Sequence, residues 1–246
     1  MLFRLLKHIL KGYFSVPEDK ESRKIATQNR SNNAIPMPKK VLNVGGRSKD
    51  IPLPHLYHGW EHILLDIDER GNPDILCDAR SLTNLVAEQY DAIYCSHNLE
   101  HYYKHDVHRV LVGFHHVLKD GGFIHIRVPD MGELMRKVVN EGLGIDDLLY
   151  VSPAGPIHVH DVIYGYATEI EQSGNDYFAH KTGFTQKSLV TSLRVSGFSS
   201  VESWCNDLEI VAIAFKTFPT EYGVALLNII NNPEFGICSS DTNSTS

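Results

Sequence analysis

Residues 40–46 read Lys-Val-Leu-Asn-Val-Gly-Gly, a short apolar run with β-branched residues that ends on two glycines. A run of this length, bounded by glycine, predicts a buried strand followed by a tight turn. Glycine lets the backbone approach a ligand closely and adopt angles that other residues avoid. Free backbone N–H groups at such a turn can bind the polar groups of a ligand. The stretch therefore predicts a ligand site that begins at Gly45 and Gly46.

Further runs of strand length follow, and helical patterns separate several of them. The strand-like runs cover residues 62–66, 74–78, 90–95 and 121–128. Each is mostly apolar, as expected of parallel strands that are covered on both faces. Apolar residues repeat at helical spacing from Val107 to Leu118, before Gly121 and Gly122, and again within 131–140. Strands that alternate with helices predict a parallel sheet.

The last third of the chain has a different pattern. Residues 141–181 show no clear period and predict an insertion or lid over a site. Residues 185–196 predict a helix, and 199–204 and 208–216 predict two strands joined by a turn. We therefore predict an α/β fold with a Rossmann-like, seven-stranded, mostly parallel sheet. Its last strand is antiparallel, and the insertion precedes the last two strands.

The domain organisation follows from composition. The chain of 246 residues divides into an N-terminal helix and linker (1–39), a main domain (40–218, with the lid at 141–181) and a C-terminal helix with a disordered tail (219–246). No apolar run approaches the ~20 residues that span a bilayer. Within residues 1–14, however, apolar side chains share one helical face, so peripheral contact with a membrane is an alternative to packing on the domain.

Charge and cysteine content restrict the function classes. The formal net charge is −7, which argues against a nucleic-acid partner because such proteins neutralise phosphates. None of the four cysteines forms a C-x-x-C pair, and we expect reduced thiols in a cytoplasmic protein. The sequence does not predict an oligomeric state.

Acidic residues end two of the predicted strands. Asp66 closes the second run, where a carboxylate can accept hydrogen bonds from a ribose diol. Asp78 closes the third run and could bind an adenine amino group. The carboxyl ends of neighbouring parallel strands share one crevice. Gly45, Asp66 and Asp78 together therefore predict a nucleoside site.

From Lys40 to Asp130 the chain resembles class I S-adenosylmethionine-dependent methyltransferases, in particular predicted ones linked to bacterial surface-polysaccharide and lipid metabolism. The residues that carry the resemblance are 41–46, 64–68, 73–82, 90–101 and 117–130. The later strand pair resembles the closing antiparallel hairpin of the family and extends the match to about Lys216. The resemblance implies that 40–218 is the methyltransferase domain and that S-adenosyl-L-methionine is the cofactor.

The resemblance also implies roles for individual residues. Gly45 and Gly46 would approach the methionine part of the cofactor, and Asp66 with its neighbour Ile67 would contact the ribose. Asp78 and the Ala79 backbone would bind the adenine. Ser96 and His97 would lie near the sulfonium methyl group.

The glycine motif departs from the family pattern. Asn43 stands where the family usually has an acid, and Arg47 stands where it has another glycine. Downstream, Pro52 and Pro54 predict that the usual first helix is short or absent. A catalytically inactive cofactor-binding or scaffold protein is therefore an alternative. A nicotinamide dehydrogenase is a weaker one, because the turn lacks G-x-G-x-x-G.

Histidines supply the candidate catalytic residues. The leading prediction is methyl transfer to a small molecule or a glycan, at oxygen, and a hydroxyl acceptor needs a base to take its proton. Among the 14 histidines, we select His97, His101 and His180. If residues 97–108 formed one helix, His97, His101, His105 and His108 would share a face and could bind zinc. Exposure on a solvated helix face is the simpler interpretation, so we predict no metal site.

Overall fold

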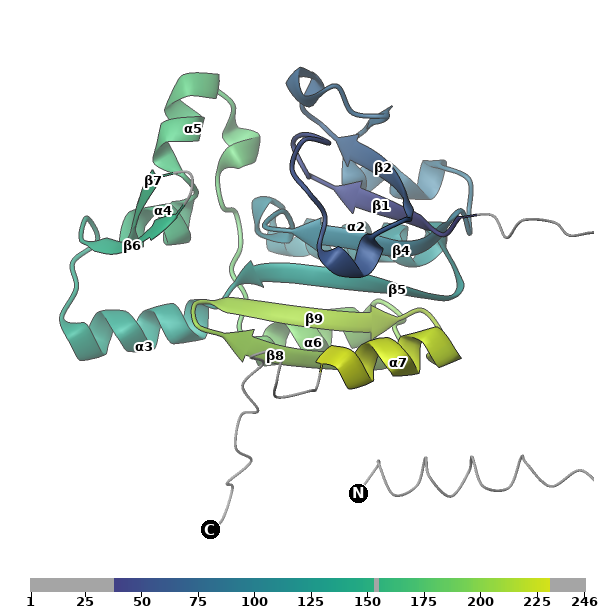
Figure 1. Ribbon diagram of the computed structural model, residues 1–246. Helices are drawn as coiled ribbons and strands as arrows, with labels where there is room; N and C mark the ends of the chain where they lie inside the picture. The colour runs from purple at the N-terminus through teal and green to yellow at the C-terminus, as the bar shows by residue number, and fades with distance from the viewer. Residues whose placement is uncertain (1–37, 153–154, 231–246) are drawn as a thin grey trace, which may run out of the picture. The chain divides into compact units, whose positions relative to one another are not determined.

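The computed structural model describes residues 38–152 and 155–230 (Figure 1). Its main feature is a seven-stranded sheet with the order β3-β2-β1-β4-β5-β9-β8. The strands are β1 (Lys40–Val44), β2 (Glu61–Asp66), β3 (Ile75–Leu76), β4 (Tyr90–Ser96), β5 (Leu118–Pro129), β8 (Ser200–Asn206) and β9 (Glu209–Phe215). Strand β9 is antiparallel to both of its neighbours, whereas β1 to β5 are mutually parallel. The predicted Rossmann-like sheet with an antiparallel last strand is confirmed.

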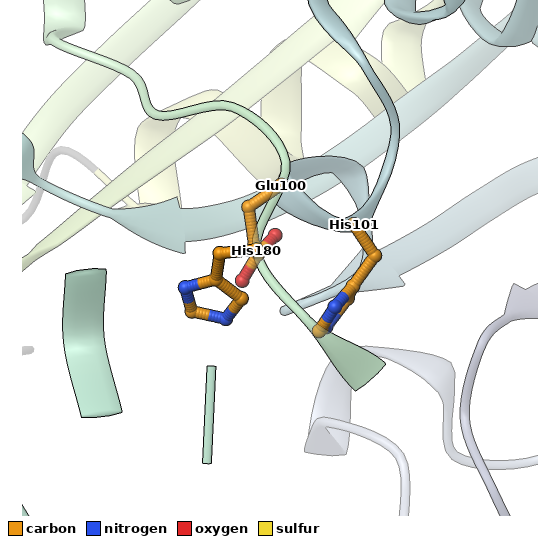
Figure 2. Close-up of side chains that lie close together, drawn as sticks. All are labelled: Glu100, His101 and His180. Atoms are coloured by element: carbon orange, nitrogen blue, oxygen red, sulfur yellow. The ribbon is translucent and has the colours of Figure 1, made fainter. Parts of the chain in front are cut away.

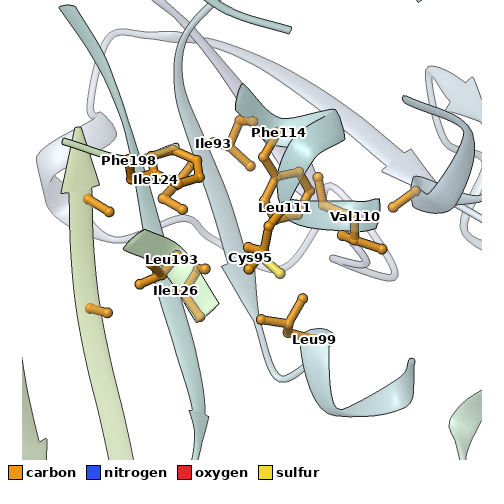
Figure 3. Packing of buried hydrophobic residues seen from close by; sticks show 14 of the residues in the cluster. Ile93, Cys95, Leu99, Val110, Leu111, Phe114, Ile124, Ile126, Leu193 and Phe198 are labelled. Atoms are coloured by element: carbon orange, nitrogen blue, oxygen red, sulfur yellow. The ribbon is translucent and has the colours of Figure 1, made fainter. Parts of the chain in front are cut away.

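Helices cover both faces of the sheet and bury its strands. The helices outside the 143–182 region are η2 (His55–Tyr57), η3 (Glu69–Gly71), η4 (Ala79–Asn84), η5 (Leu99–His101), α2 (Lys104–Val117), α3 (Met131–Glu141), α6 (Gln186–Val195) and α7 (Glu221–Ile230). Helices α2 and α6 enclose the larger core, where Phe114 and Leu193 pack against Ile93 and Ile124 (Figure 3). The segment around Tyr57 covers the opposite face. Burial on both faces explains why the parallel strands are apolar throughout.

Side chains at the first residues fix where two predicted helices begin. The Asp130 carboxylate accepts hydrogen bonds from the N–H groups of Gly132 (2.8 Å) and Glu133 (3.2 Å), which begins α3. Thr185 accepts one from the Ser188 N–H and begins α6. Gly142 ends α3 with a φ of 66°. Polar caps and a left-handed glycine are the ordinary signals of helix ends.

Three predicted elements differ from the structure. Strand β3 is shorter than 74–78, because the Asp74 carboxylate accepts hydrogen bonds from the Leu64 N–H and Lys49 Nζ, each at 2.7 Å. Strand β5 begins at Leu118, so the predicted helix over 107–118 ends one residue earlier and the two glycines lie inside the strand. Residues 97–108 do not form one helix: η5 ends at His101 and α2 begins at Lys104. The four histidines therefore do not share a helical face.

The region predicted as a lid forms an arm with helices and strands of its own, and we use this name for residues 143–152 and 155–182 (Figure 1). It contains β6 (Leu148–Ser152), β7 (Gly155–His158), α4 (Val159–Tyr164), α5 (Ala167–Ser173) and η6 (Asp176–Phe178). Strands β6 and β7 pair with each other and form a separate small sheet. At the base, the Met131 N–H donates to the Phe184 carbonyl (2.9 Å). The segment that contains α3 and the arm therefore leaves the main sheet after Asp130 and returns at Phe184, beside the point where it left.

Other predictions concern residues beyond the described ranges. The N-terminal helix with most of its linker, and the C-terminal tail from residue 231, lie outside them. The predicted helix near 220–230 is present as α7. Within the described ranges, no helix has the length and apolar character needed to cross a bilayer. The division of the chain into domains stays a prediction.

Candidate active site

A cleft of about 580 Å³ opens at the carboxyl ends of β1, β2 and β4, where it meets the arm. Its size lies within the usual range for small-molecule sites. The sheet side is lined by Gly45, Arg47, Asp66, Ile67, Asp68, His97, Asn98, His101, Pro129, Asn206, Asp207, Leu208 and Glu209. The arm side is lined by Tyr150, Ile157, Asp161, Val162, Tyr166, Glu169, Tyr177, Phe178 and His180. Residues far apart in sequence thus enclose one cavity.

The glycine turn and Asp66 lie together, as predicted. Gly45 has a φ of 71°, and a side chain there would collide with Asn98. The Asp66 carboxylate accepts the Arg47 N–H on one oxygen (2.9 Å) and the Asp68 N–H on the other (3.0 Å). A carboxylate has about four acceptor positions, so each oxygen can accept one more hydrogen bond. Such a pair of oxygens suits a vicinal diol.

Asp78 opens onto a smaller adjoining hollow of about 70 Å³, which shares Ile67, Asn98 and His101 with the main cleft. Its carboxylate already accepts hydrogen bonds from Arg80, which in turn reaches Asp106 at 3.3 Å. Although burial raises the pKa of Asp78, the hydrogen bonds and charge of Arg80 hold it below the ordinary value. Asp78 therefore stays ionised beside the cleft.

Three predicted cofactor residues line neither hollow. Gly46 packs against the Asn43 side chain, and Ala79 is buried at the start of η4. Ser96 ends β4 opposite Arg127. A role for these residues would have to come from their backbone or from shaping the turn, and it stays a prediction.

His97 is held between two carboxylates. Its Nε2 lies 2.8 Å from Glu209 Oε1, and its Nδ1 lies 3.5 Å from Glu100 Oε1. Desolvation opposes protonation, but the hydrogen bond to Glu209 and the charges of Glu100 and Glu209 outweigh it and raise the pKa of His97 to about 10. Arg127 also binds Glu209, at 2.6 Å. At neutral pH His97 is an imidazolium ion, and this form cannot accept a proton.

His101 and His180, the other two predicted catalytic residues, lie together with Glu100 (Figure 2). The two imidazole rings are 4.9 Å apart between centroids and stand edge to face. Glu100 and His101 belong to η5, directly after β4, whereas His180 belongs to the segment that returns from the arm. The N–H groups of Lys181 (2.8 Å) and Thr182 (3.1 Å) donate to the Glu100 carbonyl and fix that segment.

Backbone carbonyls orient both rings. His180 Nδ1 lies 2.9 Å from the Val162 carbonyl oxygen, so it carries the proton and leaves the Nε2 lone pair free in the neutral ring. Burial lowers the pKa of His180, and the charge of Glu100 offsets only part of that effect. His101 Nδ1 lies 3.2 Å from the Ala179 carbonyl oxygen. His180 is thus a neutral imidazole on the wall of the cleft.

Sequence reasoning missed Glu100, Glu169 and Glu209. Glu100 lies four residues after the end of β4, beside buried Leu99, and its nearness to a strand end is the one local signal that could have selected it. No local pattern marks the other two, because their partners are distant in sequence. Glu169 pairs with Arg47 at 3.0 Å and Arg70 at 3.3 Å. Arg47, the departure from the glycine motif, therefore holds the arm over the turn.

Comparison with known families agrees with this geometry. Residues 61–126 match a family model described as a methyltransferase domain. The match runs from β2 into β5 and includes the turn with Glu100 and His101. Together with the sheet order, it shows a methyltransferase domain on a Rossmann-like sheet, and the chain is an enzyme that transfers methyl groups. Its cofactor is S-adenosyl-L-methionine.

Several solved structures with a similar arrangement of strands and helices are methyltransferases. One, a SAM dependent methyltransferase from Archaeoglobus fulgidus, is 17% identical and covers 73% of this chain and 86% of its own (TM-score 0.47). Another, from Methanosarcina mazei, is 15% identical, covering 74% and 94% (TM-score 0.47). The 1,6-didemethyltoxoflavin-N1-methyltransferase of Burkholderia thailandensis, bound to 1,6-didemethyltoxoflavin and S-adenosylhomocysteine, is 18% identical, covering 74% and 72% (TM-score 0.43). No curated protein matches this chain.

Proposed function

We propose that this methyltransferase acts on a hydroxyl group of a small molecule or a glycan. The observation that carries the proposal is the pair of imidazoles, His101 and His180, on the wall of the cleft that also contains Gly45 and Asp66. Hydroxyl acceptors lose a proton during methylation, and imidazole groups are suited to assist that loss. The cluster of Glu100, His101 and His180 is therefore assigned to the acceptor hydroxyl.

The cofactor half of the cleft fits S-adenosylmethionine. The left-handed turn at Gly45 leaves no room for a side chain, which suits close approach of a ligand to the backbone. Asp66 has acceptor positions left for ribose hydroxyls, and ionised Asp78 borders the adjoining hollow for the adenine. When bound, the cofactor supplies an activated methyl group, so the protein has mainly to position the acceptor.

The arm half of the cleft suits a neutral, hydroxyl-rich acceptor. It combines aromatic side chains, Tyr150 and Tyr166, with the carboxylate of Asp161. The facing loop adds the amide of Asn206 and the carboxylates of Asp207 and Glu209. Carboxylates accept hydrogen bonds from hydroxyl groups and repel anions, whereas an amide can both donate to a hydroxyl group and accept from it. A link to surface-polysaccharide or lipid metabolism fits this chemistry and stays a proposal.

The test measures release of S-adenosylhomocysteine with a panel of sugars and phenols as acceptors. His180→Ala is expected to lower turnover about 10²-fold or more, the usual size of acid–base assistance, while cofactor affinity stays within about twofold. His105→Ala is the matched control, because its exposed imidazole lies on α2 away from the cleft. If His180→Ala keeps full turnover, the assignment of the cluster is wrong. Cofactor binding with no turnover on any acceptor would favour the inactive scaffold.

A further inference from the structure

The cluster at the end of β4 has the composition of a metal site. Glu100, His101 and His180 each offer one ligand atom, and these atoms lie within 4.8 Å of one another (Figure 2). Glu100 and His101 belong to the short helix η5. His180 is held beside them because the N–H groups of the next two residues, Lys181 and Thr182, donate to the Glu100 carbonyl. The fold thus brings His180 to Glu100 and His101 although it lies far from them in the sequence.

Glu100 lacks the hydrogen bonds that a buried carboxylate needs. The residue is 1% exposed, and within the described part of the chain neither carboxylate oxygen accepts a hydrogen bond. His97 Nδ1 lies 3.5 Å from Glu100 Oε1, which is an ion-pair distance and not a hydrogen bond. Buried polar groups are nearly always satisfied, so each unsatisfied one requires an explanation. A cation beside Glu100 would supply it.

The two imidazoles are oriented as metal-binding histidines are. A ligating histidine usually donates its other ring N–H to a carbonyl or carboxylate, which fixes the tautomer. His180 Nδ1 makes this contact with the Val162 carbonyl (2.9 Å), and His101 Nδ1 makes it with the Ala179 carbonyl (3.2 Å). His101 Nε2 also lies 3.2 Å from the His97 carbonyl oxygen. A neutral ring can donate to only one of these two carbonyls, and the tautomer that donates from Nδ1 leaves the Nε2 lone pair for a cation.

We infer that Glu100, His101 and His180 bind a divalent transition-metal ion of the zinc class. Two imidazoles and one carboxylate are a ligand set of catalytic zinc sites, which keep one position open for water or substrate. Imidazole ligands favour zinc and its neighbours over magnesium or calcium. The expectation of no metal, drawn from the sequence, considered only histidines along one presumed helix and could not include His180.

The open position would face the cleft, because His101 and His180 line it. An acceptor hydroxyl bound there would lose its proton more readily, since a cation lowers the pKa of a bound hydroxyl group. With their lone pairs bound to the ion, the two imidazoles would assist through it, and the proton would pass to water instead of to a ring nitrogen. This use of the ion rests on the proposed function, whereas binding of the ion rests on the cluster alone.

The experiment titrates the full-length, untagged protein with Co²⁺ and Zn²⁺ after treatment with a chelator. One Co²⁺ per chain is expected, with visible d–d absorption of a low-symmetry site and no thiolate charge-transfer band, which would report cysteine ligands instead. Glu100→Gln and His180→Ala should each lower affinity by at least about tenfold, the lower end for loss of a supporting contact. His105→Ala should leave affinity unchanged.

The outcomes separate the two proposals. Absence of stoichiometric binding, or binding that Glu100→Gln and His180→Ala do not weaken, overturns the metal site. His180→Gln, which keeps a polar side chain of similar size, gives a second test if His180→Ala does not fold, and its fold is checked by circular dichroism. S-adenosylhomocysteine binding is measured on the same samples. Failure of cofactor binding with intact cobalt spectra would count against the proposed function and leave the metal site standing.

Discussion

The sheet and the arm form the two sides of one cleft but are stabilised by different forces. Sheet strands such as β4 and β5 bury Ile93, Ile124 and Ile126 completely. The arm leaves Val151 72% exposed and Tyr164 54% exposed, and polar contacts connect it to the sheet side. Apolar burial contributes most of the free energy of folding, whereas exposed ion pairs contribute little. We therefore expect the sheet side, proposed to bind the cofactor, to be the more rigid, and the arm, proposed to bind the acceptor, to be the part that adapts.

Removing a core side chain should have the largest effect and should act on the sheet alone. Phe114 is fully buried between α2 and the sheet. Phe114→Ala is expected to lower the free energy of unfolding by about 3–5 kcal/mol, because a large cavity forms. Urea denaturation measures it. Val139→Ala on exposed α3 is the control and should change stability by less than about 0.5 kcal/mol. Equal losses of stability in the two variants would contradict the conclusion that apolar burial stabilises the sheet.

The next effect concerns the cofactor side. Asp66→Ala removes a carboxylate that lines the cleft beside Gly45 and should weaken S-adenosylhomocysteine binding by about 1–3 kcal/mol, the range for an unpaired buried polar contact. Calorimetric titration measures the affinity. Asp120→Ala, an exposed carboxylate beside Lys216, is the control. An unchanged affinity in Asp66→Ala would remove Asp66 from the ribose site.

Lowering the pH should reduce the free energy of unfolding through Asp78, which lies at the same edge of the sheet. Its folded pKa lies below the ordinary value because Arg80 outweighs burial. A lowered folded pKa adds stability above the unfolded pKa of about 4, and this stability is lost as pH falls through the folded value. Asp78→Asn should thus be less stable than wild type at neutral pH, and the gap should narrow below about pH 4. Urea denaturation across pH checks this, and a pH-independent gap would contradict it.

The smallest effect is expected at the arm. Glu169→Gln removes the ion pairs to Arg47 and Arg70, which should cost about 1 kcal/mol or less because both arginines are half exposed. Faster hydrogen exchange is expected in α5, with none in β4, and high salt should mimic the change. Glu171→Gln on the same helix is the control. Faster exchange in the sheet as well would show that the two sides are not independent.

The same contrast explains what the sequence could predict. Strands β1, β2 and β4 were predictable because continuous burial leaves a local apolar pattern, and Gly45 and Asp66 were predictable because they follow strand ends. The β6–β7 pair was not, because residues such as Val151 stay exposed and follow no period. The approach of His180 to Glu100 depends on a chain return that no local spacing encodes. The glycine turn and Asp66 were therefore predictable from local pattern, and His101 and His180 were selected as single residues, but the way the arm brings His180 to Glu100 was not predictable.

The junction at the base of α3 and the arm has a consequence for how such an enzyme can be altered. Asp130 and Phe184 pair side by side, and the Met131 N–H closes the gap between them. The two ends of the intervening segment consequently lie side by side, so it could be exchanged as one contiguous cassette. Because that segment carries His180, a replacement that keeps the proposed cluster with Glu100 and His101 would have to retain this imidazole.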